Sequence, residues 1–347
     1  MAWTPPPLDP TPYGIELATR IATCLEGGHE FGYGHRDYCG MGLALQEGHY
    51  CYDEVNDGRL PMLEDILRPG NTDGRAFANR DDFIAWLAVQ SDKSLARLDA
   101  PNEFYHRNQT VDRNRLEEFA RIREAVPHVS LSRWSRLWQS IPAKAEEAPS
   151  WYRYVFASYA EPQRHYHTLR HLNECLIEFD SVRHLAKQPA ALEAALWLHD
   201  IVYHPEESDN EEGSARLAND ILSDGEAPKA FIQQVRALIL VTKNHTPDAT
   251  PDSDLMCDID LAILGQNQER FFEYEAAIRE EYADVPIETY APKRTQILEG
   301  FLKRPSIYAN DHFRGLYEAT ARENLKTSIR LVAEAAAPPK RKWFGLR

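Results

Sequence analysis

The sequence predicts a mostly α-helical protein in which a small α+β domain precedes an all-α helical bundle. Apolar residues beyond about position 150 recur with a helical period, and no alternating strand pattern competes with them. Between residues 31 and 55, glycines, aromatic residues and short alternations favour strands joined by turns. A length of 347 residues with 43% apolar residues is enough for two hydrophobic cores.

The N-terminal domain is expected over residues 14–148, after a proline-rich extended lead-in over residues 1–13. Apolar spacing predicts its first helix over residues 14–26, ended by two glycines. Short strands follow within residues 31–55. Three further helices are expected, each from its apolar period. The first is the run 83–88, which Asn79 and the three residues after it cap, and the others cover residues 113–125 and 130–141.

A linker is predicted over residues 143–149, where charged residues and alanines end at a proline. We therefore place the domain boundary near residue 148. The all-α domain is expected over residues 149–336 and a basic tail over residues 337–347. Its helices are predicted over residues 151–159, 165–180, 190–202, 211–223, 228–242, 257–263, 269–283, 289–303 and 312–335.

Charge and cysteine content exclude several classes of protein. With 39 Lys and Arg against 54 Asp and Glu, the formal charge is −15, which disfavours general binding to nucleic acid. Five scattered cysteines are unlike a disulfide scaffold and indicate free thiols. No apolar stretch is long enough to span a membrane, and the start lacks the features of a signal peptide. We expect a cytoplasmic protein without a membrane partner.

A group of histidines and cysteines in the N-terminal domain is a weak candidate for zinc binding. The pairs His35-x3-Cys39 and His49-x-Cys51 have irregular spacing, whereas structural zinc favours close, regular pairs. A hairpin with a buried cysteine and a half-exposed histidine is the simpler interpretation.

The all-α domain contains polar residues where helix packing alone would select apolar ones. His167 and His171 are four apart, which puts both on one face of the helix predicted over residues 165–180. The pair His199-Asp200 ends the apolar run 194–198, and a third segment, Asp258-Ile259-Asp260, lies inside an apolar helix. Imidazoles and carboxylates gathered in one place are typical of a metal site.

The order of these segments resembles the HD superfamily of metal-dependent phosphohydrolases, in particular a bacterial group of predicted HD phosphohydrolases without an assigned substrate. The resemblance covers residues 152–330 and implies an all-α HD-type bundle. It rests on four segments in the expected order, because a single His-Asp pair arises often by chance. These segments are Arg164-His165-Tyr166-His167-Thr168-Leu169-Arg170-His171, Trp197-Leu198-His199-Asp200-Ile201-Val202-Tyr203, Asp209-Asn210-Glu211-Glu212-Gly213-Ser214-Ala215 and Asp258-Ile259-Asp260-Leu261-Ala262-Ile263-Leu264-Gly265.

The resemblance implies a divalent metal ion held by one histidine, the His-Asp pair and a distant aspartate, which gives His171, His199, Asp200 and Asp260. The Tyr-His-x3-His arrangement resembles the cyclic-nucleotide phosphodiesterase branch, and this makes His167 the candidate general acid. The ion would be Mn, Co, Ni, Fe, Zn or Mg. Two choices stay open, His167 or His171 as the ligand and Asp258 or Asp260 as the closing aspartate.

Further residues are candidates for contact with substrate or for proton transfer. Arg164 and Arg170 are available for phosphate oxygens as bidentate donors. The resemblance makes Asn210 a candidate substrate contact. It makes Glu211, in the first turn of the next helix, a candidate proton relay. His245 is a candidate substrate contact, and with His204 it is a spare ligand that would permit a second metal, although one metal is favoured.

Together these features predict hydrolysis of a phosphoester or phosphoanhydride of a small molecule, such as a nucleotide, by metal-activated water, with Asp200 orienting that water. Two alternatives remain. The first is a metal-containing binding or sensor module, and the second is a nuclease, which the negative charge disfavours. The N-terminal domain resembles no family we recognise, and we expect it to gate the substrate, engage a protein partner or form a homo-oligomer.

Overall fold

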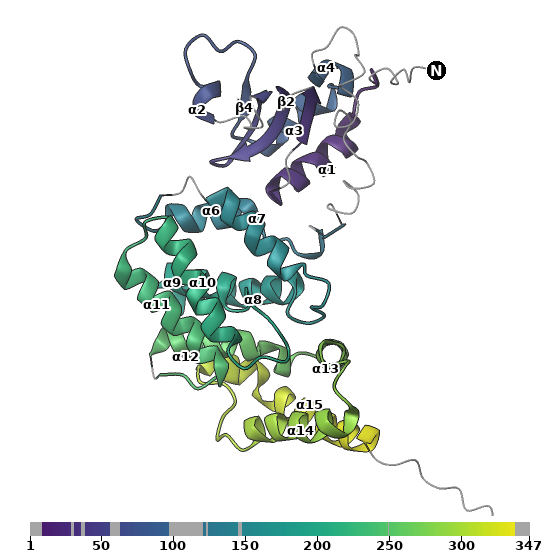
Figure 1. Cartoon of the computed structure of the whole chain (residues 1–347), viewed down its shortest axis with the longest axis vertical. Helices are drawn as coiled ribbons and strands as arrows, with labels where there is room; N and C mark the ends of the chain where they lie inside the picture. Colours follow the sequence, from purple (N-terminus) through teal and green to yellow (C-terminus); the bar gives the residue numbers. More distant parts are fainter. Residues whose placement is uncertain are drawn as a thin grey trace, which may run out of the picture. The chain divides into compact units, whose positions relative to one another are not determined.

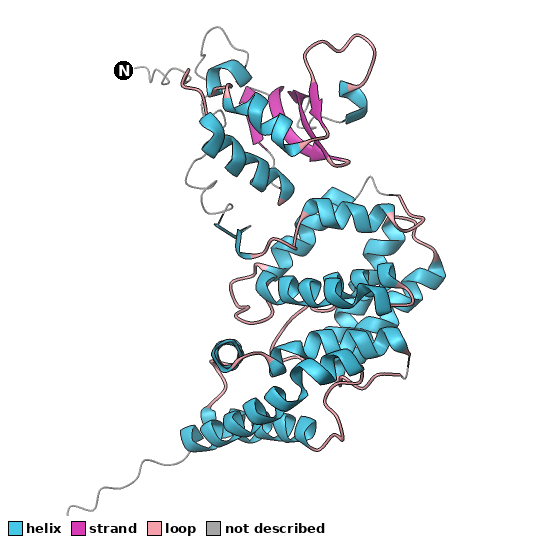
Figure 2. Ribbon diagram, turned by 180° about the vertical axis from the view of Figure 1, so that it is seen from behind, coloured by secondary structure: helices cyan, strands magenta, loops and turns pink. Residues whose placement is uncertain are grey.

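The computed structural model describes residues 9–28, 31–35, 39–55, 63–96, 121–122, 124–144, 148–248 and 250–336. The chain forms two compact units, Met1–Arg153 and Tyr154–Arg347, and each is described by itself. The predicted fold class is confirmed, because the first unit is α+β and the described residues of the second form helices and loops but no strands (Figure 2). The helix predicted over residues 113–125 lies largely outside the described residues, as do the first eight residues and the basic tail.

The first unit contains a four-stranded antiparallel sheet in the order β1-β2-β3-β4. Glu47 and Gly48 join β2 to β3 in a two-residue turn, with φ of 48° and 78° at the two positions. Positive φ at both positions matches the twist of the flanking strands. The four strands are β1 (Phe31–His35), β2 (Cys39–Gln46), β3 (His49–Val55) and β4 (Arg75–Phe77).

Helices cover both faces of this sheet. Tyr50 stacks on Phe83 of α3 with ring centroids 4.6 Å apart, whereas Cys51, on the opposite face of the strand, packs against Leu63 and Ile66 of α2. The cap Asn79 accepts hydrogen bonds from two backbone N–H groups of α3, as predicted. The helices are α1 (Gly14–Glu26), α2 (Leu63–Ile66), α3 (Arg80–Ala88), α4 (Asp92–Ala96) and α6 (Leu131–Gln139).

The second unit is built around α9 (Pro189–Leu198), whose residues from Ala191 to Leu198 are all buried. A helix that is buried on every side lies inside the core. Helices α8, α10, α11 and α12 pack around it (Figure 1). The other helices are α7 (Ala148–Tyr159), α8 (Leu169–Val182), α10 (Asn210–Asp224), α11 (Lys229–Leu240), α12 (Pro251–Asp260), α13 (Gln268–Glu281), α14 (Ile287–Leu302) and α15 (Asp311–Ala336), and the 3₁₀ turns are η2 (Arg183–Leu185), η3 (Val241–Lys243) and η4 (Leu261–Gly265).

Several helix boundaries differ from the sequence prediction. The largest difference is at α12, which begins at Pro251 instead of residue 257 because Thr250 caps it by accepting a hydrogen bond from the Ser253 backbone N–H. α7 begins at Ala148, so Pro149 lies in a first helical turn, where no N–H donor is needed, rather than ending a linker. α8 begins at Leu169 instead of residue 165, because Thr168 caps it by accepting a hydrogen bond from the Arg170 backbone N–H. α9 ends at Leu198, which places His199 and Asp200 just past its C-terminus.

Among the described residues, no helix combines the length and the apolar character needed to cross a bilayer.

Candidate metal centre

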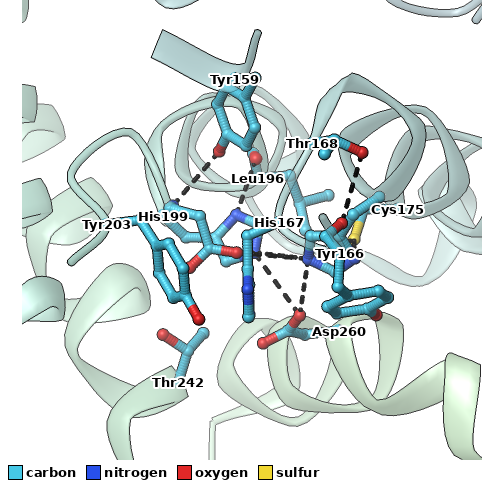
Figure 3. A network of polar contacts seen from close by, with 12 residues as sticks. Tyr159, Tyr166, His167, Thr168, Cys175, Leu196, His199, Tyr203, Thr242 and Asp260 are labelled. Atoms are coloured by element: carbon cyan, nitrogen blue, oxygen red, sulfur yellow. Dashed lines mark hydrogen bonds and ion pairs between the residues drawn. The ribbon is translucent and has the colours of Figure 1, made fainter. Parts of the chain in front are cut away.

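Two buried histidines from different helices face each other at the centre of the second unit. His171 lies in the first turn of α8, and His199 caps the C-terminus of α9. Their Nε2 atoms are 3.2 Å apart. The Nδ1–H of His199 donates to the Leu196 carbonyl at 2.9 Å (Figure 3), which leaves Nε2 as the lone-pair atom. Two imidazole lone pairs at this distance repel unless a cation or a proton lies between them.

Two carboxylates complete the group. Asp200 Oδ2 lies 3.1 Å from His199 Nε2 and 3.4 Å from His171 Nε2. Asp260, the last residue of α12, places Oδ1 3.2 Å from His171 Nε2 and 3.5 Å from His199 Nε2. Donor atoms bound to one ion at about 2.1 Å are separated by about 3.0 to 3.4 Å in octahedral or tetrahedral geometry. The four side chains therefore fit a single divalent cation.

Cys175 is near this group but is not placed to bind the same ion. His171, Cys175, His199 and Asp260 each bring one donor atom within 4.8 Å of the others. The Cys175 sulfur is, however, 3.8 Å from Nδ1 and 3.7 Å from Nε2 of His171. A sulfur equally far from both ring nitrogens lies away from the Nε2 lone pair, where an ion would bind. Asp200 therefore fits the ligand set better than Cys175.

The buried imidazoles and carboxylates of this group stabilise one another's charged forms. Burial alone would lower the pKa of His199, but Asp200 and Asp260 outweigh it and raise that pKa well above its ordinary value. Burial likewise favours neutral Asp260, yet the imidazoles of His199, His171 and His245 hold its pKa well below the usual range. Protons and a divalent cation would therefore compete for the same imidazole lone pairs.

The structure distinguishes the two candidate aspartates of α12. Asp258 is 1% exposed, and its carboxylate accepts hydrogen bonds from the backbone N–H groups of Ala309 and Asn310, at 2.8 and 2.6 Å. Burial raises the pKa of Asp258 to about 6. Asp258 therefore anchors the start of α15, and Asp260 is the residue that contacts the histidines.

His167 does not share a helix with His171, and in this respect the prediction was wrong. It lies before the Thr168 cap, in a turn whose backbone N–H groups are bound by a carboxylate from α13. Its ring still lies near the metal group, with its centroid 5.9 Å from that of His171. The ring stacks on Tyr203 with centroids 4.1 Å apart, and the two lie face to face in Figure 3.

The carboxylate that binds this turn belongs to Glu281, which sequence reasoning missed. Glu281 Oε1 accepts from the backbone N–H groups of residues 165, 166 and 167 at 2.9, 2.8 and 3.0 Å. Oε2 binds His167 Nδ1 at 2.8 Å and accepts from the Tyr203 hydroxyl at 2.7 Å. One signal was visible, since Glu281 falls on the buried face of α13 with Phe271, Tyr274 and Ile278.

Arg164 is a structural residue and not a phosphate contact, contrary to expectation. Its side chain is fully buried and donates to the carbonyl oxygens of Asp200 at 2.6 Å and Ile201 at 3.1 Å. It also donates to the His167 carbonyl at 3.2 Å and to Glu161 at 3.0 Å. These bonds occupy four of the five guanidinium N–H groups, so Arg164 fixes the turn that carries Asp200.

Arg170, the second predicted phosphate contact, points to the surface. It is half-exposed, pairs with Glu174 and Glu273, and does not line the cavity described below. The structure therefore places Arg170 away from the cavity, because the first turn of α8 directs His171 inward and its neighbour outward.

Asn210 and Glu211 lie where α10 begins, and both line the cavity. The Asn210 side chain is already bound, since it accepts from the His204 backbone N–H and donates to the His204 carbonyl, both at 2.9 Å. It therefore closes the loop before α10. Glu211 is half-buried at the cavity wall.

His245 contacts the metal group, whereas His204 does not. His245 Nε2 lies 2.8 Å from Asp260 Oδ2, on the oxygen that does not face His171 and His199. Its backbone has a φ of 46°, and Arg304 binds its carbonyl oxygen at 2.8 Å. His204 is exposed and does not line the cavity. The two spare histidines therefore do not form a second metal site within the described residues.

A cavity of about 890 Å³ opens onto this group. Its lining includes Asp200, Asp260, His167 and His245. Residues of α13 and α14, several of them aromatic or apolar, also line it. Cavities of about 300 to 1,000 Å³ bind small molecules. The arrangement can thus place a small ligand beside the metal ligands.

In the first unit, the hairpin interpretation holds for the residues that are described. Cys51 is fully buried in the sheet, and the half-exposed His49 contacts the Glu47 carbonyl through Nδ1 at 3.2 Å. The side chains of His35 and Cys39 lie outside the described residues.

Comparison with known proteins finds no matching family model, no similar curated protein and no similar solved structure.

Proposed function

We propose that this protein is a metal-dependent phosphohydrolase that cleaves a phosphoester or phosphoanhydride of a small molecule. The observation that carries the proposal is the convergence of His171, His199, Asp200 and Asp260, of which the two aspartates line a cavity of ligand size. Their order in the chain is that of the HD superfamily, which the sequence resembles. Nitrogen and carboxylate ligands in this number suit a first-row divalent ion and leave coordination positions open.

When bound, the ion would lower the pKa of water and withdraw charge from the phosphorus. The protein supplies position and proton transfer. Arg164 and the Tyr159 hydroxyl bind the backbone of Asp200, so its carboxylate is held against His199 and can orient water. The proposed ligand geometry thus depends on a turn fixed by buried hydrogen bonds.

His167 is the proposed proton donor to the leaving group. Its Nδ1 is held by Glu281, so Nε2 is the ring nitrogen left for a ligand in the cavity that the residue lines. In the imidazolium form this nitrogen would give its proton to the leaving oxygen, and Glu281 would keep the ring in place while it does so.

The proposal is tested with the purified full-length protein loaded with Mn²⁺, Co²⁺, Ni²⁺ or Mg²⁺. Release of phosphate or pyrophosphate is measured over phosphomonoesters, nucleotides and pyrophosphate esters. We expect release from at least one class, and its loss in Asp200→Ala. Asp220→Ala, an exposed aspartate on α10, serves as the matched control and should keep full activity. If no metal supports release from any compound, the proposal is wrong.

A further inference from the structure

The backbone at His245 adopts a left-handed conformation next to the metal group, with a φ of 46°. Among the described residues other than glycine, a positive φ is also found at Glu47 and Glu226, which are both exposed. His245 is instead half-buried and contacts Asp260. Left-handed backbone costs free energy for a residue with a Cβ atom, so contacts around His245 have to stabilise it.

Arg304, just past the C-terminus of α14, binds the backbone at this position. Its Nη1 donates to the His245 carbonyl at 2.8 Å, and its Nη2 donates to the Asn244 carbonyl at 2.9 Å. Two successive carbonyls bound to one planar guanidinium fix the direction of the chain between them. The guanidinium lies 4.7 Å from the ring centroid of Phe301, and that ring is 6.1 Å from the ring of His245. Arg304 therefore holds the backbone that aims the imidazole.

The segment that carries Arg304 is itself held by α15. Arg322 donates to three carbonyl oxygens of this segment, at 3.1, 2.9 and 3.1 Å, and these belong to Leu302, Arg304 and Pro305. Its Nε pairs with Glu318 at 2.7 Å. The last carbonyls of a helix lack partners within the helix, and Arg322 supplies donors for them. The position of Arg304 is thus fixed by contacts that do not involve the metal group.

The His245 imidazole contacts the oxygen of Asp260 that does not face the other two histidines. His245 Nε2 lies 2.8 Å from Oδ2 of Asp260. The other oxygen, Oδ1, lies 3.2 Å from His171 Nε2 and 3.5 Å from His199 Nε2 (Figure 3). A carboxylate can rotate about its Cβ–Cγ bond, so a hydrogen bond to one oxygen sets the direction of the other. Groups that bind a metal ligand from its outer side orient the ligand in this way.

We propose that Arg304 is a positioning residue of the metal group. Arg304 holds the left-handed backbone at His245, and His245 holds Oδ2 of Asp260. Oδ1 is thereby directed at the two histidines that would share an ion with it. The inference rests on the metal-binding part of the proposed function and not on the hydrolysis.

The test is a titration of the metal-free full-length protein with Co²⁺, followed by visible absorption, so the readout is binding and not turnover. Arg304→Met removes both hydrogen bonds but keeps an apolar side chain beside Phe301, and it should weaken Co²⁺ binding about ten- to hundredfold. Arg304→Lys keeps a donor that can reach one carbonyl and should cause a smaller loss. The matched control is Lys303→Met, at a neighbouring side chain that is 75% exposed, and it should bind Co²⁺ as the wild type does.

A double-mutant cycle distinguishes an effect through His245 from a general loss of stability. His245→Phe removes the nitrogen that contacts Asp260 but keeps a ring, and it should weaken Co²⁺ binding by itself. If Arg304 acts through His245, Arg304→Met should cause no further loss in the His245→Phe protein. An equal loss in both backgrounds would mean that Arg304 acts through the fold as a whole, and this overturns the inference. Should Arg304→Met fail to fold, Arg304→Lys completes the same cycle.

The failure of this inference and the failure of the proposed function give different results. Wild-type affinity for Co²⁺ in Arg304→Met, in a protein that releases phosphate, overturns the positioning role alone. The expected cycle in a protein that releases phosphate from no compound supports the positioning role and overturns the phosphohydrolase. A wild-type protein that binds no Co²⁺ overturns both.

Discussion

Glu281 binds His167 Nδ1 at 2.8 Å although 114 residues separate the two in the chain. The same carboxylate holds the backbone of the turn that carries the histidine. One buried side chain thus sets both the position and the ring orientation of the proposed proton donor. This relationship makes Glu281 a positioning residue, and its consequences can be measured.

Glu281→Gln should destabilise the protein near neutral pH and much less in acid. Burial raises the pKa of Glu281, but His167 and the other donors outweigh it and lower that pKa to about 2 from 4.5. A depressed carboxylate pKa gives stability that is present above about pH 4.5 and lost as the pH falls towards 2. The effect is at most about 3 kcal/mol. Thermal unfolding between pH 3 and 7 measures it, and the exposed Glu280→Gln serves as the matched control.

His171→Ala and His167→Ala should have opposite consequences. His171 Nε2 faces His199 and both carboxylates, so its loss should abolish binding of the metal. His167→Ala should keep the metal and lower kcat about 100- to 10,000-fold, as expected for a lost general acid. Elemental analysis combined with turnover separates the two variants. The reverse pattern would mean that the roles assigned here are exchanged.

Variants of the two aspartates of α12 should differ in the same measurement of metal content. Asp260→Asn removes a charged oxygen that faces both histidines and should cause loss of the metal. Asp258→Asn should keep the metal and lower the melting temperature, because the amide accepts fewer of the hydrogen bonds that hold residues 309 and 310. Loss of metal in Asp258→Asn would contradict the assignment.

Arg164→Met should destabilise the fold by about 2 to 4 kcal/mol and weaken metal binding, since it leaves the buried carbonyls of Asp200 and Ile201 without donors. Arg170→Met is the matched control. Its ion pairs are at the surface and are worth less than about 1 kcal/mol, so chemical denaturation should barely change.

Metal affinity should increase with pH through the neutral range. Burial lowers the pKa of His199, but the adjacent carboxylates outweigh it and raise that pKa well above its ordinary value, so protons compete with the ion at Nε2. Titration of the metal-free protein with Zn²⁺ at several pH values, with proton release followed by calorimetry, measures this competition. Affinity independent of pH would argue against the imidazole ligands.

How much could be predicted differs between the fold and the site. Helical period and caps are local properties, so the helices of the second unit were predicted, with several shifted ends. The donor types of the site were also visible, because His199 and Asp200 follow a buried apolar run. By contrast, the local sequence does not distinguish Asp258 from Asp260, since both lie on α12. Each carboxylate contacts a different segment that is distant in the chain.

The sequence by itself determined which segments of the described chain are helical and which side chains there offer imidazole and carboxylate groups. Only the tertiary structure decided which of them meet. It placed His167 in a turn before α8 that Glu281 binds, buried Arg164 beneath Asp200, and turned Arg170 towards solvent. The physical reason is that the period of apolar residues along a helix determines which side chains share a face. The distances between helices depend instead on the packing of residues far apart in the chain.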